Sequence, residues 1–186
     1  MAAVNRPLWA LAALLLVAAP EAPRAQERLQ LIEQQIKAGL LSNFLKYTEW
    51  PDDHPLHTGA ALVCLYGGDP FGGQLASMAG RTVNQSVIAV RTVAHMQELD
   101  ACALIVVDAG QALRWTELRA ALSGKSVLTV SDFSGFAPSG GMIEFIHVGD
   151  RIGIEINAHA VAAARLEVQD RLLDLARAIH TGAPEP

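Results

Sequence analysis

Residues 101–108, with the sequence ACALIVVD, form an unbroken apolar run that ends in an aspartate. Continuous apolar runs of this kind are typical of strands in a parallel sheet whose two faces are both covered by helices. Comparable runs and helical segments alternate on either side of it: strands at residues 61–66, 87–91, 102–107 and 126–131, helices at residues 71–78, 94–99 and 111–122. This alternation predicts right-handed βαβ units and an α/β fold, a single three-layer domain with a mostly parallel sheet flanked by helices.

The pattern changes in the last third of the chain. Residues 142–148 and 151–156 are rich in β-forming residues, and the Gly-Asp pair between them is a tight-turn signal. They predict a C-terminal antiparallel β-hairpin at the edge of the sheet. Asn157 is expected to cap a short helix that runs to about residue 164. The leucines and isoleucine of residues 169–180 predict a last helix that packs on the core.

A long helix is predicted at residues 26–47, ahead of the first strand. Its apolar residues recur every three or four positions: Leu29, Ile32, Ile36, Leu40, Phe44 and Tyr47. That spacing predicts an amphipathic helix with one continuous apolar face. The helix is expected to end before Trp50, because the residue that precedes a proline disfavours helical geometry.

The first 25 residues have the layout of a cleavable secretory signal peptide. A short segment with one arginine precedes the apolar residues 8–19, and small residues and proline follow as far as Ala25. The apolar run is shorter than the ~20 residues that a membrane-spanning helix needs, although an uncleaved anchor is the alternative. We therefore expect cleavage near Ala25 and export of one domain at residues 26–182, followed by a tail at residues 183–186.

Composition restricts the classes of function. Of the 186 residues, 51% are hydrophobic and 18% are charged, which is typical of a folded globular domain. The formal net charge is -5 and the sequence has no basic block, so no nucleic-acid partner is expected. His54 and His57 lie near two aspartates, but in a predicted solvated loop, so no metal site is predicted there.

The chain has 2 cysteines, Cys64 and Cys102, which both lie in predicted strands. In an oxidising compartment an even number of cysteines favours a disulfide. Two buried free thiols that act as small hydrophobic groups are the alternative. Their spacing does not fit a redox-active CxxC motif.

No set of residues has the spacing of a catalytic motif. The sequence lacks a G-x-S-x-G elbow and a Walker lysine loop, so we expect neither a catalytic site nor a cofactor. Asp132, Glu144 and Glu155 could converge, but carboxylates in and beside strands are more often edge or solvent-facing groups. The glycine-rich segment at residues 67–73, GGDPFGG, follows the first predicted strand. Its backbone N–H groups could bind an anion, and a plain βα turn is the alternative.

Two further features are unusual. Asn43 lies on the predicted apolar face of the first helix, where a buried amide must find partners in a loop or in a ligand. Residues 132–141, DFSGFAPSGG, place Phe133 and Phe136 among small residues between two predicted strands. Glycines at that end of a parallel sheet often border a pocket, and hydrophobic plugs are the equal alternative for the two phenylalanines.

Several segments together carry a resemblance to a known family. They occur in a characteristic order: IKAGLLSNFLKYTEWP at residues 36–51, LVCLYGGDPFGGQL at 62–75, ACALIVVD at 101–108, SVLTVSDFSGFAPSGGMIEFIHVGDRIGIEIN at 126–157 and RLLDLARAI at 171–179. In this order and spacing the chain resembles the YfiR/HmsC-like periplasmic repressors over roughly residues 30–180. The N-F-x-K-[FY]-x-E-W-P segment and the L-T-V-S-D…G-F-A…G-G-M-I block are specific when they occur together.

The resemblance implies an exported α/β regulator that has no catalytic activity of its own. Proteins of this kind repress an inner-membrane diguanylate cyclase by binding its periplasmic sensor domain, and so lower cyclic di-GMP and biofilm formation. The resemblance also implies a disulfide between Cys64 and Cys102. A homodimer is expected, because regulators of dimeric membrane receptors tend to match their symmetry.

The candidate ligand or partner site combines the turn at residues 67–73, the loop at residues 132–141 and two residues of the first resembling segment. Its members are Asn43, Trp50, Gly67, Asp69, Pro70, Asp132, Phe133, Phe136, Gly140 and Gly141. A small molecule held in a pocket between that turn and that loop would act as a release signal. The alternative function is therefore a periplasmic small-molecule-binding sensor module that acts on another membrane signalling protein.

Overall fold

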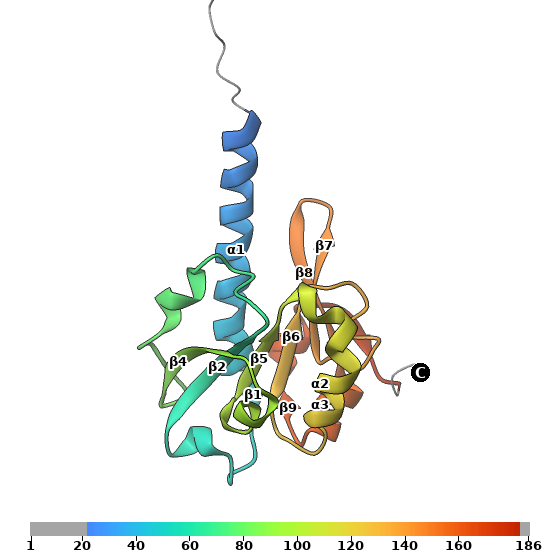
Figure 1. Ribbon diagram of the computed structural model, residues 1–186. Helices are drawn as coiled ribbons and strands as arrows, with labels where there is room; N and C mark the ends of the chain where they lie inside the picture. The colour runs from blue at the N-terminus through green and yellow to red at the C-terminus, as the bar shows by residue number, and fades with distance from the viewer. Residues whose placement is uncertain (1–21, 183–186) are drawn as a thin grey trace, which may run out of the picture.

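The computed structural model describes residues 22–182 (Figure 1). The apolar run of the predicted signal peptide and the predicted tail at residues 183–186 lie outside the described residues. The described chain forms one mixed α/β domain with a mostly parallel sheet, helices on both faces and antiparallel strands near the C-terminus, which confirms the predicted fold class. Across residues 22–182, no helix has both the length and the apolar character needed to cross a bilayer.

The main sheet has 8 strands in the order β10-β8-β7-β6-β5-β2-β4-β3. Their bounds are β2 Ala60–Tyr66, β3 Thr82–Val83, β4 Ser86–Val93, β5 Leu104–Val107, β6 Leu128–Ser131, β7 Ile143–Val148, β8 Arg151–Asn157 and β10 Ala176–His180. The five neighbours from β4 to β7 are parallel, whereas β7 pairs with β8 and β3 pairs with β4 in antiparallel fashion. A separate pair of short strands, β1 (Thr48–Glu49) and β9 (Glu167–Val168), is antiparallel.

The helices are one long α-helix and several short ones. The α-helices are α1 Ala22–Lys46, α2 Trp115–Ala121, α3 Ala158–Ala163 and α4 Asp170–Leu173, and the 3₁₀ helices are η1 Pro55–His57, η2 Gln74–Met78, η3 Met96–Ala101 and η4 Ala109–Arg114. The helices predicted at residues 71–78 and 94–99 are therefore 3₁₀ turns, the usual form of such short connections. The helix predicted at residues 111–122 divides into η4 and α2.

The core lies on both faces of the sheet, because each central strand sends alternate side chains to opposite sides. In β5, Leu104 and Val106 face one cluster, which α1 and η2 cover. Ile105 and Val107 face a second cluster, which η3 and α2 cover. The unbroken apolar run that predicted β5 thus has the two-sided burial expected of a parallel strand.

The apolar face predicted for α1 is only partly correct. Leu29, Ile32 and Ile36 are exposed, because the N-terminal half of α1 extends beyond the sheet (Figure 1). The buried face is rotated from the predicted one and lies on the C-terminal half of the helix, with Ala38, Leu41, Phe44 and Leu45 in the core. That half is apolar on several sides, so its contact with the sheet rather than its spacing selects the buried face.

The helix predicted at residues 169–180 is wrong. Only α4 is helical, and β10 follows it as an edge strand that pairs in parallel with β8. In β10, Arg177 and Ile179 are exposed while their neighbours are half-buried, a period of two that is typical of a strand. The segment is rich in good helix formers, and pairing with the open edge of β8 overrides that local preference.

The predicted C-terminal hairpin is present as β7 and β8. Gly149 in its turn has a φ of +59°, a left-handed conformation that favours glycine. Asn157 caps α3 as predicted, since its side-chain oxygen accepts a hydrogen bond of 2.8 Å from the backbone N–H of Ala160. Figure 1 shows the hairpin tip beside the free half of α1.

Candidate functional site

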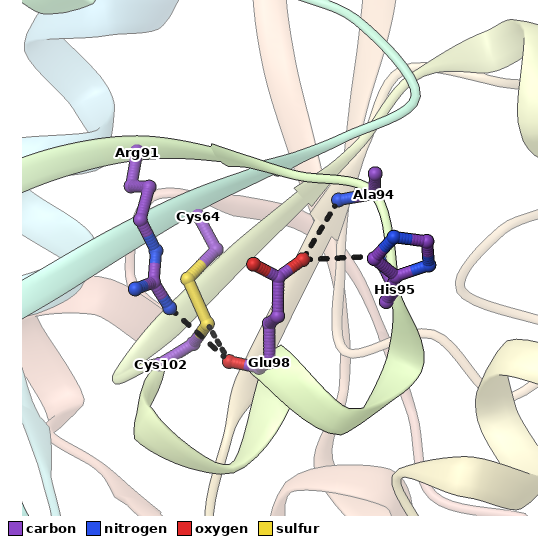
Figure 2. Close-up of a disulfide and its surroundings, with 6 residues drawn as sticks. All are labelled: Cys64, Arg91, Ala94, His95, Glu98 and Cys102. Carbon is purple, nitrogen blue, oxygen red and sulfur yellow. Dashed lines mark hydrogen bonds between the residues drawn. A yellow bond between two sulfur atoms is a disulfide. The ribbon is translucent and has the colours of Figure 1, made fainter.

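The two cysteines form a disulfide, as predicted (Figure 2). Cys64 lies in β2 and Cys102 lies two residues before β5, the parallel neighbour of β2, with a Cα–Cα distance of 5.9 Å. Both residues are fully buried in the cluster that α2 covers. The bridge therefore joins two central strands beneath η3.

The segment that carries Cys102 is held at its other end by Glu98. The Glu98 carboxylate accepts hydrogen bonds from the backbone N–H groups of Ala94 (3.1 Å) and His95 (3.0 Å), as Figure 2 shows. These backbone hydrogen bonds stabilise the charged carboxylate and lower the pKa of Glu98. The Glu98 carbonyl oxygen accepts a hydrogen bond from Arg91 of β4 and lies 3.5 Å from the sulfur of Cys102.

A buried lysine connects α1 to the carboxyl end of the sheet. The Lys37 ammonium lies 2.7 Å from the Glu33 carboxylate, one turn earlier on α1, and 2.9 Å from the Asp132 carboxylate, which follows β6. His147 of β7 approaches Glu33 at 3.3 Å. We call Glu33, Lys37, Asp132 and His147 the ion cluster.

The ion cluster fixes the charge of its central lysine. Desolvation alone lowers the pKa of Lys37, but the hydrogen bonds and negative charges of Glu33 and Asp132 outweigh it and raise the pKa above its usual value. The hydrogen bond from Lys37 is the main reason why the pKa of Glu33 is lowered; desolvation opposes it, and His147 adds a smaller lowering contribution. Lys37 therefore stays charged although it is only 6% exposed.

A polar groove of about 450 Å³ lies beside the ion cluster. Residues of α1 from Gln26 to Lys37 form one wall, and Pro70 and Asp132 lie in the other. Two predicted site residues, Pro70 from the turn at residues 67–73 and Asp132 from the loop at residues 132–141, thus share one groove, and α1 forms its other wall. No sequence signal placed α1 there.

In the glycine-rich turn, two backbone N–H groups already donate hydrogen bonds within the turn. The carboxylate of Asp69 accepts hydrogen bonds from the N–H groups of Phe71 (2.8 Å) and Gly73 (2.7 Å). Gly67 has a φ of +99°, and its Cα faces the side chain of Gln111. These contacts favour the plain βα turn over anion binding.

Beyond Asp132, the loop at residues 132–141 packs on the face of the sheet that α2 covers, opposite to α1. Phe136 is fully buried, and its ring centroid lies 4.5 Å from that of Trp115 and 5.0 Å from that of Phe133. Gly141 is required beside it, since a Cβ there would overlap the ring of Phe136. The two phenylalanines act as hydrophobic plugs rather than as the border of an open pocket.

Glu144 of β7 binds the backbone of the loop at residues 132–141. It is buried in β7, where its carboxylate accepts hydrogen bonds from the backbone N–H groups of Gly135 (3.0 Å) and Ala137 (2.9 Å). The prediction that Glu144 is an edge or solvent-facing group is therefore wrong. A carboxylate inside an otherwise apolar strand was the available signal, because a buried charge needs several hydrogen-bond donors.

A mostly apolar cavity lies elsewhere, between α2 and α3. Its volume is about 380 Å³, and Thr129, Met142 and Gly140 are among the residues that line it. Arg119 and His159 are the ionisable residues among its lining side chains. Of the predicted site residues, only Gly140 lines this cavity.

Trp50 and Asn43 lie away from the predicted turn and loop. Trp50 lines a cavity of about 240 Å³ together with Thr48. The indole N–H of Trp50 and the hydroxyl of Thr48 are buried and have no hydrogen-bond partner among the described residues. Asn43 is half-buried on the outer side of α1. The structure therefore divides the ten predicted site residues among several separate places.

Within residues 22–182, no group of three or more His, Cys, Asp or Glu side chains is arranged to hold a metal ion. His54, predicted in a solvated loop, is buried, and its Nδ1 accepts a hydrogen bond of 3.1 Å from the N–H of Leu56. Burial chiefly lowers the pKa of His54, and the neighbouring His57 lowers it further.

A comparison with protein-family models gives a match to residues 34–177, from a model described as YfiR/HmsC-like. The match begins within α1 and ends within β10, so it reaches every strand of the main sheet. A search of curated proteins gave no match.

Proposed function

The chain belongs to the YfiR/HmsC-like family, and from this membership we propose that it represses an inner-membrane diguanylate cyclase by binding the periplasmic sensor domain of that enzyme. Repression lowers cyclic di-GMP and restrains biofilm formation. The single observation that carries the proposal is the family match over residues 34–177. The family is one of periplasmic regulators rather than of catalysts, which agrees with this proposal.

Other features support an exported regulator. The disulfide between Cys64 and Cys102 suits an oxidising compartment. We propose cleavage of the signal peptide near Ala25, which leaves residues 26–182 as the folded domain and residues 183–186 as a tail. The protein acts without catalysis, so purified material should be inert toward generic ester and phosphate substrates.

The test combines capture with a cellular readout. In cells that produce a tagged copy, crosslinking and purification from solubilised membranes should enrich a diguanylate cyclase. Deletion of the gene for this protein should raise the cellular concentration of cyclic di-GMP, and the rise should disappear in a strain that also lacks the captured cyclase. Unchanged cyclic di-GMP after deletion would contradict the proposal. Enrichment of a histidine kinase instead would keep a regulator but change its output.

A second function, binding of a small molecule, is favoured by the cavity between α2 and α3. Its volume of about 380 Å³ falls in the range of ligand sites. The ionisable side chains that line it, Arg119 and His159, are basic groups, and its walls are largely small and apolar. The ligand that fits is a carboxylate with an apolar body.

Thermal shift measurements with a series of aromatic and aliphatic carboxylates test this second function. A binding carboxylate should raise the melting temperature, and Ala163→Leu, which fills the cavity, should abolish the rise. Ala162→Leu is the matched control, because Ala162 is exposed on the same helix and does not line the cavity. No shift across the series, or an equal loss in both variants, would count against the cavity as a ligand site.

A further inference from the structure

The N-terminal half of α1 carries exposed apolar side chains. The exposed fractions of Leu29, Ile32 and Ile36 are 68%, 44% and 47%. Figure 1 shows this half of the helix clear of the sheet, beside the hairpin of β7 and β8. A helix of so few turns is only marginally stable in water by itself, so a second surface packed against it would stabilise it.

The exposed apolar residues follow a heptad pattern. Leu29 and Ile36 are seven residues apart and occupy position a, and Ile32 between them occupies position d. The same spacing continues to Gly39 at position d and Asn43 at position a. We call these five residues the α1 seam. The core residues of α1 lie on the other side of the helix, and Leu29, at the N-terminal end of the seam, also lines the polar groove beside the ion cluster.

The C-terminal part of the α1 seam suits close contact between two helices. A Cβ on Gly39 would have no atom within 4 Å among its surroundings, so a partner helix can approach the backbone there. Asn43 is half-buried, and an asparagine at a single a position pairs with its equivalent in the other strand and fixes the register. An asparagine in this place is best matched by a second asparagine.

The charges beside the α1 seam on one copy of the helix are complementary to those on a second copy. Arg28 occupies position g and Glu33 occupies position e of the next heptad. In a parallel, in-register pair, a residue at g faces the residue at e five positions later on the other helix. Arg28 of each copy therefore faces Glu33 of the other, whereas an antiparallel pair would place like residues together.

We infer that α1 pairs with α1 of a second copy of this chain as a short parallel coiled coil along the α1 seam. This inference rests on the homodimer expected in the sequence analysis, which we propose here, and names its surface; it does not depend on which membrane protein is regulated. The pair places the two sheets side by side with the same orientation. Both hairpins of β7 and β8 then lie at the same end of the dimer.

Analytical ultracentrifugation of the purified protein over a range of concentrations tests the inference. Ile32→Glu buries a charge in the seam and should weaken the dimer by about tenfold or more. Leu31→Glu is a matched control, because Leu31 has the same exposed fraction of 44% but lies off the seam. It should leave the dimerisation constant unchanged. Circular dichroism of each variant checks that the fold is retained.

Cysteine crosslinking tests the direction of the pair without weakening it. Both native cysteines are in the disulfide, so Ile36→Cys introduces a single free thiol. Oxidation with diamide should join two copies of Ile36→Cys, because equivalent a positions face each other only in a parallel, in-register pair. Leu31→Cys should remain uncrosslinked under the same conditions.

The outcomes separate this surface from the proposed homodimer. A dimer that responds to Ile32→Glu but not to Leu31→Glu, with crosslinking at residue 36, supports the α1 seam. A dimer that neither variant weakens lies on another surface, which overturns the seam and keeps the homodimer. A monomer at every concentration overturns both, and a seam-sensitive dimer without crosslinking at residue 36 overturns the parallel register.

Discussion

The ammonium of Lys37 lies 2.9 Å from the carboxylate of Asp132, 95 residues later in the chain, and so joins α1 to the end of β6. This ion pair stands where α1 leaves the sheet. The residues of α1 before Lys37 are mostly exposed, whereas many of those after it pack into the core. Lys37 thereby anchors the projecting half of the helix.

Replacement of that lysine should destabilise the domain. Lys37→Met keeps the side-chain volume but leaves Glu33 and Asp132 without their cation, and we expect a loss of about 2 kcal/mol in the free energy of unfolding. Removal of one partner from a fully buried pair costs about 3–5 kcal/mol, and here both carboxylates retain some contact with water. Urea unfolding measures the loss. Lys46→Met, at an exposed lysine of the same helix, should change little.

The contribution of the ion cluster depends on pH in a defined direction. Because the pKa of Lys37 is raised, its stabilisation is present below the ordinary value of 10.5 and is lost as the pH rises through the folded-state value. Because the pKa of Glu33 is lowered, its stabilisation is present above 4.5 and is lost as the pH falls. The difference in stability between the wild type and Lys37→Met should be constant between these limits and shrink outside them. A difference that changes within this range of pH would contradict this assignment.

Loss of the disulfide should have the largest effect on stability. The bridge closes a loop with a sequence separation of 38, and its removal in Cys64→Ala/Cys102→Ala should lower the free energy of unfolding by about 4 kcal/mol. Wild type unfolded in the presence of a reductant should show the same urea midpoint as the variant. Equal stability of the variant and the oxidised wild type would make the bridge incidental.

A methyl group at residue 141 should disturb the plugged loop. Gly141→Ala pushes against the ring of Phe136, and overpacking of this kind costs about 1–3 kcal/mol. Gly39→Ala is the control, because that helical position has open space for a Cβ and should gain up to about 1 kcal/mol. Thermal unfolding distinguishes the two variants, because the melting temperature should fall for Gly141→Ala and rise for Gly39→Ala. A neutral Gly141→Ala would mean that Phe136 moves freely.

Glu144 should be more sensitive than an exposed glutamate. Glu144→Gln replaces one of two acceptor oxygens with a donor, so one of the N–H groups of Gly135 and Ala137 loses its partner. We expect a loss of about 1–3 kcal/mol. Hydrogen exchange at Ala137 should accelerate in the variant. Exposed Glu117, replaced in the same way, should leave that exchange rate unchanged.

The cap at Glu98 predicts acid sensitivity near the disulfide. Since backbone hydrogen bonds lower the pKa of Glu98, its stabilisation is present above 4.5 and is lost as the pH falls through the folded-state value. Glu98→Gln should therefore resemble the wild type at low pH and be less stable at neutral pH. Amide exchange at Ala94 and His95 reports the local effect. A variant that differs from the wild type only at low pH would refute the cap.

The parallel strands could be predicted from the sequence because their burial is encoded in runs such as residues 101–108. The face of α1 and the last strand could not. The periodicity of Leu29, Ile32 and Ile36 correctly marks an apolar face, but it cannot tell whether the partner of that face is this sheet or another molecule. The residues of β10 favour a helix locally, and only the open edge of β8 makes them a strand.

The candidate site was harder to predict than the fold. Pro70 and Asp132 do come together, since loops at the carboxyl ends of parallel strands meet at one edge of the sheet. Glu33 and Lys37 have the spacing of a helical ion pair, yet nothing local shows that Asp132 completes it. Such contacts depend on how the long helix lies across the sheet, which the sequence pattern leaves open.

The single bridge between Cys64 and Cys102 also determines how the protein can mature. With 2 cysteines in the chain, only one intramolecular pairing exists, so oxidation cannot trap a scrambled isomer. The thiol of Cys64 emerges first during synthesis and must wait for the residues up to Cys102 before it can react within the chain. Maturation therefore requires a thiol oxidase but no disulfide isomerase, and the yield of native protein should follow the supply of oxidant alone.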